Sequence, residues 1–93
     1  MGAHDLRSTT LTASGSVSGA RGRVRAMTYL ATATPGSITI KNGGASGVTI
    51  LEVATPGIAD AYDIIIPDSG FLCSTDIYAV LTDVASVTVM YEG

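Results

Sequence analysis

The sequence predicts an all-β fold, a small antiparallel β-sandwich or jelly-roll-like barrel of about seven or eight short strands with an extended N-terminal arm. Short runs rich in Val, Ile, Thr and Tyr alternate with breaks rich in Gly, Pro, Asp and Ser. No segment repeats apolar residues at the three- and four-residue spacing of an amphipathic helix. The 93 residues are enough for one domain.

The composition favours self-association. The chain is 46% hydrophobic but only 14% charged, with 5% aromatic residues and no tryptophan. Its core must therefore be built from aliphatic side chains, which suits stacked sheets. So small a domain buries a modest share of its surface, and its few charges cannot cover the rest. We expect exposed apolar area, which usually marks an interface.

The charge balance and the apolar runs argue against two classes of partner. The net charge is -3 and the isoelectric point is about 4.7, whereas a nucleic-acid binder normally carries a basic face. No apolar run has the length of a membrane span, and the first residues lack the apolar core of a signal peptide. We expect folding in a reducing cytoplasm, with no nucleic-acid partner and no membrane partner.

Residues 1–20 are predicted to form an N-terminal arm, and residues 21–93 the β-sandwich domain. The arm consists largely of Ser, Thr, Gly and Ala, and Leu11 and Val17 are its main side chains worth burying. Burial of so little apolar surface does not offset the entropy of ordering the chain. We expect the arm either to order on assembly, as an edge strand of its own or a neighbouring sheet, or to remain a tail. Leu11 and Val17 are candidate interface residues.

The first strong strand covers residues 23–34. Strict alternation places Val24, Ala26, Thr28 and Leu30 on one face, and Arg23, Arg25, Met27 and Tyr29 on the other. The same alternation aligns Arg21 with Arg23 and Arg25. This row of candidate interface residues either pairs with carboxylates of a partner or protects a solvated strand from mispairing.

A glycine-rich loop at residues 42–47 separates the strands expected at 37–41 and 48–53. The loop lacks the Gly-Lys-Ser/Thr ending of a phosphate-binding P-loop, and no helix is expected after it. Glycine and asparagine adopt positive φ readily, as tight turns require. The loop is therefore predicted to be a hairpin connection rather than a nucleotide site. The tetrapeptide Ala-Thr-Pro-Gly, at 33–36 and again at 54–57, is read as one kind of turn used twice.

Three consecutive isoleucines, Ile64, Ile65 and Ile66, place bulk on both faces of a short strand. One face can fill the domain core. The other needs a second cover, which we expect to be another subunit. All three are candidate interface residues.

The C-terminal segment, residues 76–92, is predicted to be a β-hairpin that forms the spine of a sheet. Two strand-like runs flank a break at residues 83–86. In the second run Val87, Val89 and Tyr91 share one face, opposite Thr88 and Met90.

No residue pattern indicates catalysis, a cofactor or a metal. His4 is the one histidine, and Cys73 is the one cysteine, expected to be a buried apolar residue rather than a reactive thiol or an intersubunit bridge. A zinc site needs more ligands than these two residues supply. The acidic residues are spread over turns and form no calcium-binding loop. We expect a protein that is not an enzyme, with no catalytic, cofactor-binding or metal-binding residues.

The order of these elements resembles small virion structural proteins of tailed bacteriophages. The resemblance covers residues 21–91 and rests on the basic strand 21–25, the Gly36–Gly44 segment, the Ile64–Gly70 element and the strands of 76–91. It implies a capsid decoration (cement) protein that binds and stabilises the head shell, frequently as a homotrimer. The implied partners are further copies of the chain and the major capsid protein or another virion protein. The implied location is the virion, assembled in the host cytoplasm.

Two other roles fit the same fold. One is a tail, neck or fibre component, since these parts also use small β-sandwiches. The other is a small carbohydrate- or receptor-binding β-sandwich. Sugar sites usually offer aromatic platforms, and the absence of tryptophan from this chain disfavours that reading.

Overall fold

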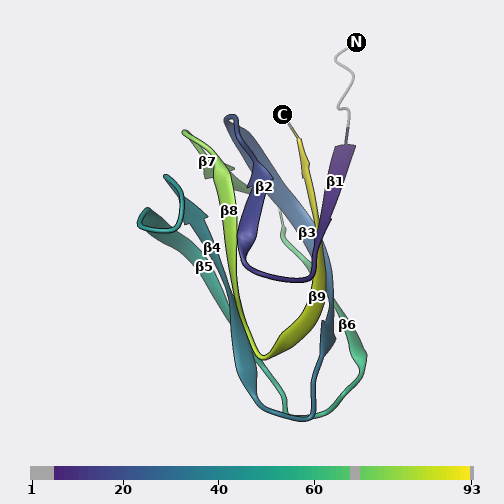
Figure 1. Cartoon of the computed structure of the whole chain (residues 1–93). Helices are drawn as coiled ribbons and strands as arrows, with labels where there is room; N and C mark the ends of the chain where they lie inside the picture. Colours follow the sequence, from purple (N-terminus) through teal and green to yellow (C-terminus); the bar gives the residue numbers. More distant parts are fainter. Residues whose placement is uncertain (1–5, 68–69, 93) are drawn as a thin grey trace.

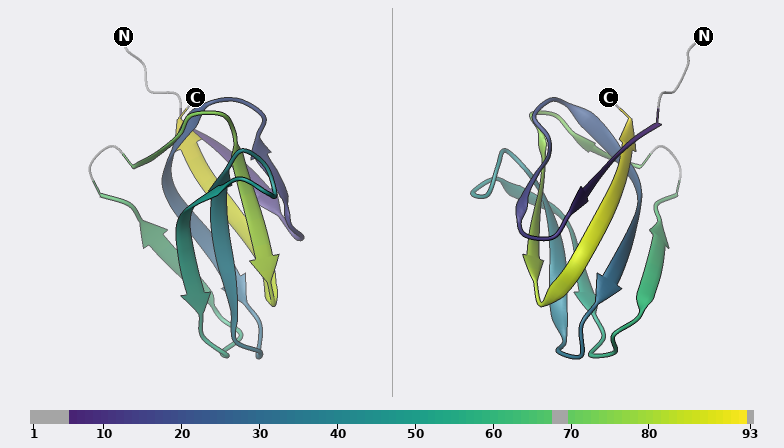
Figure 2. Two further views of the ribbon diagram at one scale, coloured as in Figure 1. Left: turned by 90° about the vertical axis from the view of Figure 1, so that its left-hand side faces the viewer. Right: turned by 45° about the vertical axis from the view of Figure 1, so that its right-hand side comes forward.

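The computed structural model describes residues 6–67 and 70–92 as two antiparallel β-sheets packed face to face (Figures 1 and 2). The all-β sandwich prediction is confirmed. The described residues form nine strands, more than the seven or eight expected, because the N-terminal segment contributes two.

The strands alternate between the two sheets along much of the chain. Sheet A has the order β1 (Leu6–Leu11), β9 (Val84–Glu92), β3 (Gly22–Ala31) and β6 (Ala61–Ile65), with β7 (Phe71–Cys73) also paired to β3. Sheet B has the order β2 (Gly15–Ser18), β8 (Ile77–Thr82), β4 (Gly36–Asn42) and β5 (Val48–Thr55).

The core lies between the sheets and is mainly aliphatic, as the composition predicts. Its largest fully buried side chains are Met27, Ile38, Ile40, Ile77, Val24, Val87, Val89 and Cys73. In β9 the face predicted from alternation is confirmed, because Val87, Val89 and Tyr91 are buried while the residues between them are partly exposed.

A β-bulge at Arg25 changes the orientation of the side chains of β3. Val24 pairs with Tyr91 of β9 and Ala26 pairs with Met90, so Arg25 is the extra residue. An extra residue shifts a period-two alternation by one step. Val24 faces the core before the bulge and Met27 after it. The strict alternation predicted for residues 23–34 is therefore wrong beyond residue 25.

The predicted C-terminal hairpin is wrong in its pairing. β8 lies in sheet B and β9 in sheet A, so the two strands are not bonded to each other. The chain changes sheets at Asp83, whose φ of 51° turns it sharply, and β8 and β9 form a V in the lower half of Figure 1. Each strand has neighbours on both sides, which explains their strand-rich composition.

Residues 6–18 belong to the sandwich, which differs from the expected division at residue 20. β1 pairs with β9 from Leu6 opposite Glu92 to Leu11 opposite Val87, and β2 pairs with β8. Val17 is buried and Leu11 is half-buried. Strand pairing satisfies the backbone groups of the arm, so large side chains are not needed to order it. This segment is ordered in the single chain, whereas residues 1–5, including His4, lie outside the described residues.

Candidate functional site

Side chains of sheet A that point away from sheet B form parallel rows, because directly paired residues project to the same side. Beyond the three rows named below, a fourth row contains Ser86, Leu30 and Ala61. We call this surface the outer face of sheet A. The upper row contains Leu6, Glu92, Arg23 and Leu72. The middle row contains Ser8, Met90, Ala26 and Ile65. The lower row contains Thr10, Thr88, Thr28 and Asp63.

The middle row is apolar apart from Ser8, and it runs from the half-buried Met90 and Ala26 to the exposed Ile65. Ile65 has 82% of its surface accessible to solvent, the largest fraction of any of the exposed large hydrophobic residues in the described chain. Ala26 lies between Met90 and Ile65, and its small side chain leaves a shallow hollow of about 290 Å³. The hollow is lined by Ala26, Met27, Asp63, Ile64, Ile65 and Met90. A protruding isoleucine beside an apolar hollow is suited to contact with another protein.

The isoleucine triplet places bulk on both faces of its segment, as predicted. Ile64 is half-buried against the core, Ile65 points outward, and Ile66 is only 7% exposed. The backbone N–H of Ile66 donates to the carbonyl oxygen of Arg25 at 3.0 Å, which fixes the chain where it leaves β6. The expected cover by a second subunit remains a prediction.

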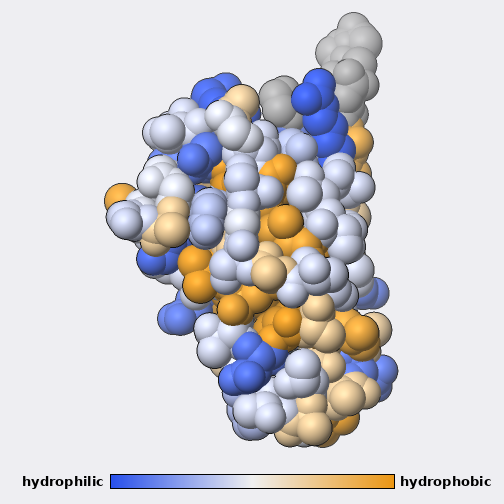
Figure 3. Space-filling view, viewed as in Figure 1, coloured by the Kyte–Doolittle hydropathy of each residue, from blue (hydrophilic) through white to orange (hydrophobic). Residues whose placement is uncertain are grey.

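Exposed apolar area is also visible elsewhere. Figure 3 shows hydrophobic residues reaching the surface in the middle and lower parts of the view in Figure 1. Of the exposed apolar side chains, Val48 on sheet B is 68% exposed and Leu6 on the outer face of sheet A is 58% exposed. The composition therefore predicted the exposure correctly.

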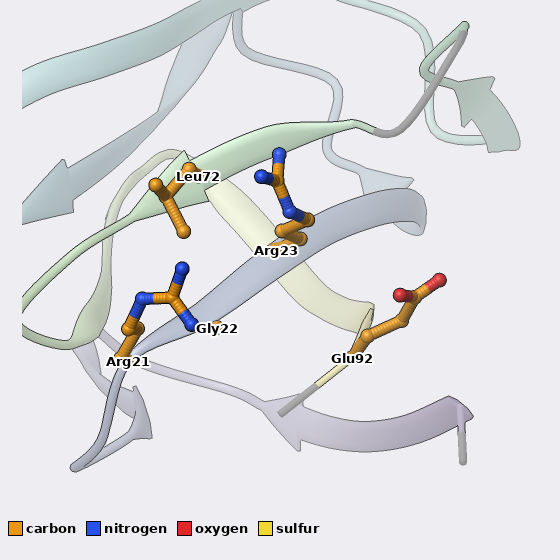
Figure 4. Close-up of a pocket in the computed structure, with 5 residues that line it drawn as sticks. All are labelled: Arg21, Gly22, Arg23, Leu72 and Glu92. Carbon is orange, nitrogen blue, oxygen red and sulfur yellow. The ribbon is translucent and has the colours of Figure 1, made fainter. Parts of the chain in front are cut away.

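The three arginines do not form one uniform row. Arg25, displaced by the bulge, makes an ion pair with Glu92. Arg21 and Arg23 border a hollow of about 180 Å³ together with Gly22, Leu72 and Glu92. Figure 4 shows Arg23 and Arg21 reaching toward Leu72, while the carboxylate of Glu92 points away from them. Within the described ranges, no ion pair is formed by Arg21 or Arg23.

Sequence reasoning missed Asp63 and Met90 as members of this surface. Asp63 and Ile65 are two residues apart on β6 and therefore share a face. The hydroxyl of Thr28 donates to the carboxylate of Asp63, which anchors the acid in the lower row. Alternation along β6 was available as a signal, but the pairing of β6 with β3 was not. Leu11 and Val17 pack against or within the core, and are not part of this surface.

The glycine-rich loop is a hairpin connection between β4 and β5, as predicted. Gly43 and Gly44 have φ values of 107° and 80°, and their N–H groups donate to one carboxylate oxygen of Asp76 at 2.7 and 3.0 Å. In return, the side-chain oxygen of Asn42 accepts the N–H groups of Thr75 and Asp76. Two successive N–H groups of this kind can bind an anion. Here they bind the chain's own carboxylate, which joins the β4–β5 loop to the β7–β8 loop.

Cys73 is fully buried, as expected for an apolar core residue. Burial raises the pKa of its thiol above the ordinary value of 9.0, and the nearby Asp76 carboxylate raises the pKa further. The thiolate is the reactive form, so the folded protein is expected to react with thiol reagents much more slowly than the urea-unfolded chain. Equal rates in the two states would contradict this prediction.

The same pKa shift predicts the effect of pH on stability. Above pH 9 the unfolded chain loses the thiol proton while the folded protein keeps it, so the unfolded state binds fewer protons. The free energy of unfolding should therefore fall as the pH rises above about 9, the ordinary thiol value. The thiol's contribution to this decrease should be absent from the Cys73→Ala variant. Urea titrations of both proteins at several pH values measure the difference.

Residues 6–67 and 70–92 contain no cluster of three or more His, Cys, Asp and Glu side chains arranged to hold a metal ion. The same residues contain no helix that could cross a membrane. On the outer face of sheet A, apolar and charged side chains lie together, and this face is the candidate functional surface.

Comparisons with protein-family models, with curated proteins and with solved structures found no match to this chain.

Proposed function

We propose that this protein is a structural component of a tailed-bacteriophage particle, a capsid decoration protein that binds and stabilises the head shell as an oligomer. The observation that carries the proposal is the outer face of sheet A, where the exposed Ile65 lies beside an apolar hollow and between charged side chains. Such a surface suits protein–protein contact. The order of the sequence elements, which resembles small virion proteins, supports the particle as the setting.

The shape of the domain also suits a role on a repeating lattice. Its two sheets, joined by short turns, form a small compact unit that can occupy many equivalent sites. Weak contacts by single copies become strong when several linked copies engage neighbouring sites at once. An oligomer bound across capsomers would hold them together in this way.

A role in carbohydrate binding has less support from the side chains. Tyr29 and Tyr62 stack with ring centroids 5.4 Å apart, but Tyr29 is only 6% exposed. Tyr29 is therefore part of the core and Tyr62 packs against it, so the pair does not offer the open platform on which a sugar ring packs. A tail, neck or fibre protein would use the same kind of contact surface. Imaging of the particle distinguishes such a location from one on the head.

Electron cryo-microscopy of purified particles of the phage that encodes the chain tests the proposal. We expect copies of the nine-stranded sandwich at a repeated position on the outside of the head. The matched control is the particle produced without this protein, which should lack that density and lose its DNA at a lower temperature. Absence of the chain from purified particles by mass spectrometry would refute the proposal, and density confined to the tail would assign the protein there.

A further inference from the structure

We infer that the outer face of sheet A binds the same face of a second copy about a two-fold axis that runs along the middle row. The inference deepens the proposed function, on which its biological role rests, by naming the contact through which the copies associate. The resemblance to virion proteins implies a trimer, whereas the placement of charges on this face suits a pair.

Arg23 and Asp63 lie on opposite sides of the middle row. Arg23 belongs to the upper row and Asp63 to the lower row, each one row away from Ala26. One row corresponds to two strand residues, about 7 Å. A rotation of 180° about the middle row exchanges the two rows between facing copies. Arg23 of each copy then lies opposite Asp63 of the other, displaced sideways by one strand spacing of about 5 Å, which a long arginine side chain can span.

Two other charged residues of the face are paired within the chain. Arg25 forms an ion pair with Glu92, which lies next to Arg23 in the upper row. Asp63 is oriented by the hydroxyl of Thr28, whereas Arg23 makes no ion pair among the described residues. A two-fold axis parallel to the strands would instead bring Arg23 toward Arg23 of the second copy. Such like-charge contacts are strongly unfavourable.

The apolar groups lie where this axis passes. Ile65, Ala26 and Met90 form the centre of the face, and the hollow of about 290 Å³ lies beside them. Facing sheets pack about 10 Å apart and cross at about 30°. The crossing offsets the two Ile65 side chains, so each can pack toward the hollow of the other copy. Exposed apolar surface at the centre and complementary charges around it are the arrangement of a specific interface.

A charge-exchange experiment tests the pairing. Wild-type protein should sediment as a dimer at micromolar concentration. Arg23→Asp places two carboxylates opposite each other at both contacts, and Asp63→Arg does the same with two cations. Each variant alone should therefore dimerise about tenfold more weakly or worse, since like charges across an interface are costly. An equimolar mixture of the two variants restores opposite charges at both contacts and should form a mixed dimer of near wild-type affinity.

The controls isolate the contact. Lys41→Asp on sheet B and Asp60→Arg make the same changes at residues outside the three rows and should leave the dimer intact. Ile65→Glu should produce a monomer whose circular dichroism is unchanged. Should a charge-reversed variant fail to fold, Arg23→Gln and Asp63→Asn replace it, and each is expected to weaken the dimer.

Three results would overturn the inference: a monomer at high micromolar concentration, a trimer, or a mixture with no preference for the mixed dimer. A trimer seen on the phage head would leave the proposed function standing. Conversely, the protein could form the dimer in solution but be absent from the particle. That result would refute the proposed function and leave the inferred dimer contact standing.

Discussion

Replacement of Met27 by alanine is expected to lower the free energy of unfolding by about 2–5 kcal/mol, the range for removing a large aliphatic side chain from a packed core. Met27 is fully buried between the sheets, paired with Ile64 on one side and Val89 on the other. No polar group is removed, so the loss comes from apolar contacts and the remaining cavity. Urea titration followed by circular dichroism measures it.

Leu30→Ala is the matched control for Met27→Ala. Leu30 lies on the same strand but is 44% exposed on the outer face of sheet A, so its loss should be about 1 kcal/mol or less. Without the bulge at Arg25, Met27 would face solvent and Leu30 the core. A larger loss for Leu30→Ala than for Met27→Ala would therefore contradict both the bulge and the orientation of β3.

The second large effect is expected from Asp76→Ala, which should reduce the free energy of unfolding by about 1–3 kcal/mol. Asp76 is half-buried, and one of its carboxylate oxygens accepts both the Gly43 and Gly44 N–H groups. Hydrogen bonds to a charged acceptor contribute more than neutral ones, although partial solvation reduces their worth. The amide hydrogens of Gly43 and Gly44 should exchange with solvent faster in the variant than in the wild-type protein.

Asp60→Ala provides the comparison for Asp76→Ala. Its carboxylate accepts one N–H, that of the adjacent Ala61, and the residue is exposed. The replacement should change stability by no more than about 0.5 kcal/mol, as is usual for surface substitutions. Equal losses for the two variants would indicate that the contact between the β4–β5 and β7–β8 loops contributes little.

Local sequence patterns were sufficient for the fold class and for the orientation of several strands. Alternation predicted the buried face of β9, and the glycine-rich loop at 42–47 was correctly predicted to close a hairpin. Both depend on neighbouring residues alone: side chains alternate along a strand, and glycine permits positive φ in a tight turn.

The features that the sequence did not predict depend on distant partners. The bulge at Arg25 is defined by the register of β3 against β9, more than sixty residues along the chain. The segment around Asp83 looks like a hairpin turn locally, and it becomes a crossing between sheets because β8 and β9 each bond to other strands. The β-compatible residues of the N-terminal segment allowed an edge strand on the chain's own sheet, but they did not show that the segment would pair with both sheets.

The candidate site was predicted in part. The isoleucine triplet indicated that one face of its strand needs an external cover, and the structure shows that this face carries Ile65. The arginine pattern indicated a row of positive charge, but its position relative to the isoleucines came only from the structure. Alternation along β6 could have placed Asp63 beside Ile65. Met90 could not be added, because it reaches the same surface only through the pairing of β9 with β3. A functional surface assembled across strands is therefore less visible in sequence than one carried by a single loop.

The pairing of β1 with β9 has a consequence for biosynthesis. Leu6, among the first described residues to leave the ribosome, bonds to the strand that ends at Glu92. β9 also lies between β1 and the rest of sheet A, so β1 cannot take its final place in the sheet before β9 arrives. Pairing between such distant segments also makes folding slow. The complete sandwich should thus form only after β9 has emerged from the exit tunnel.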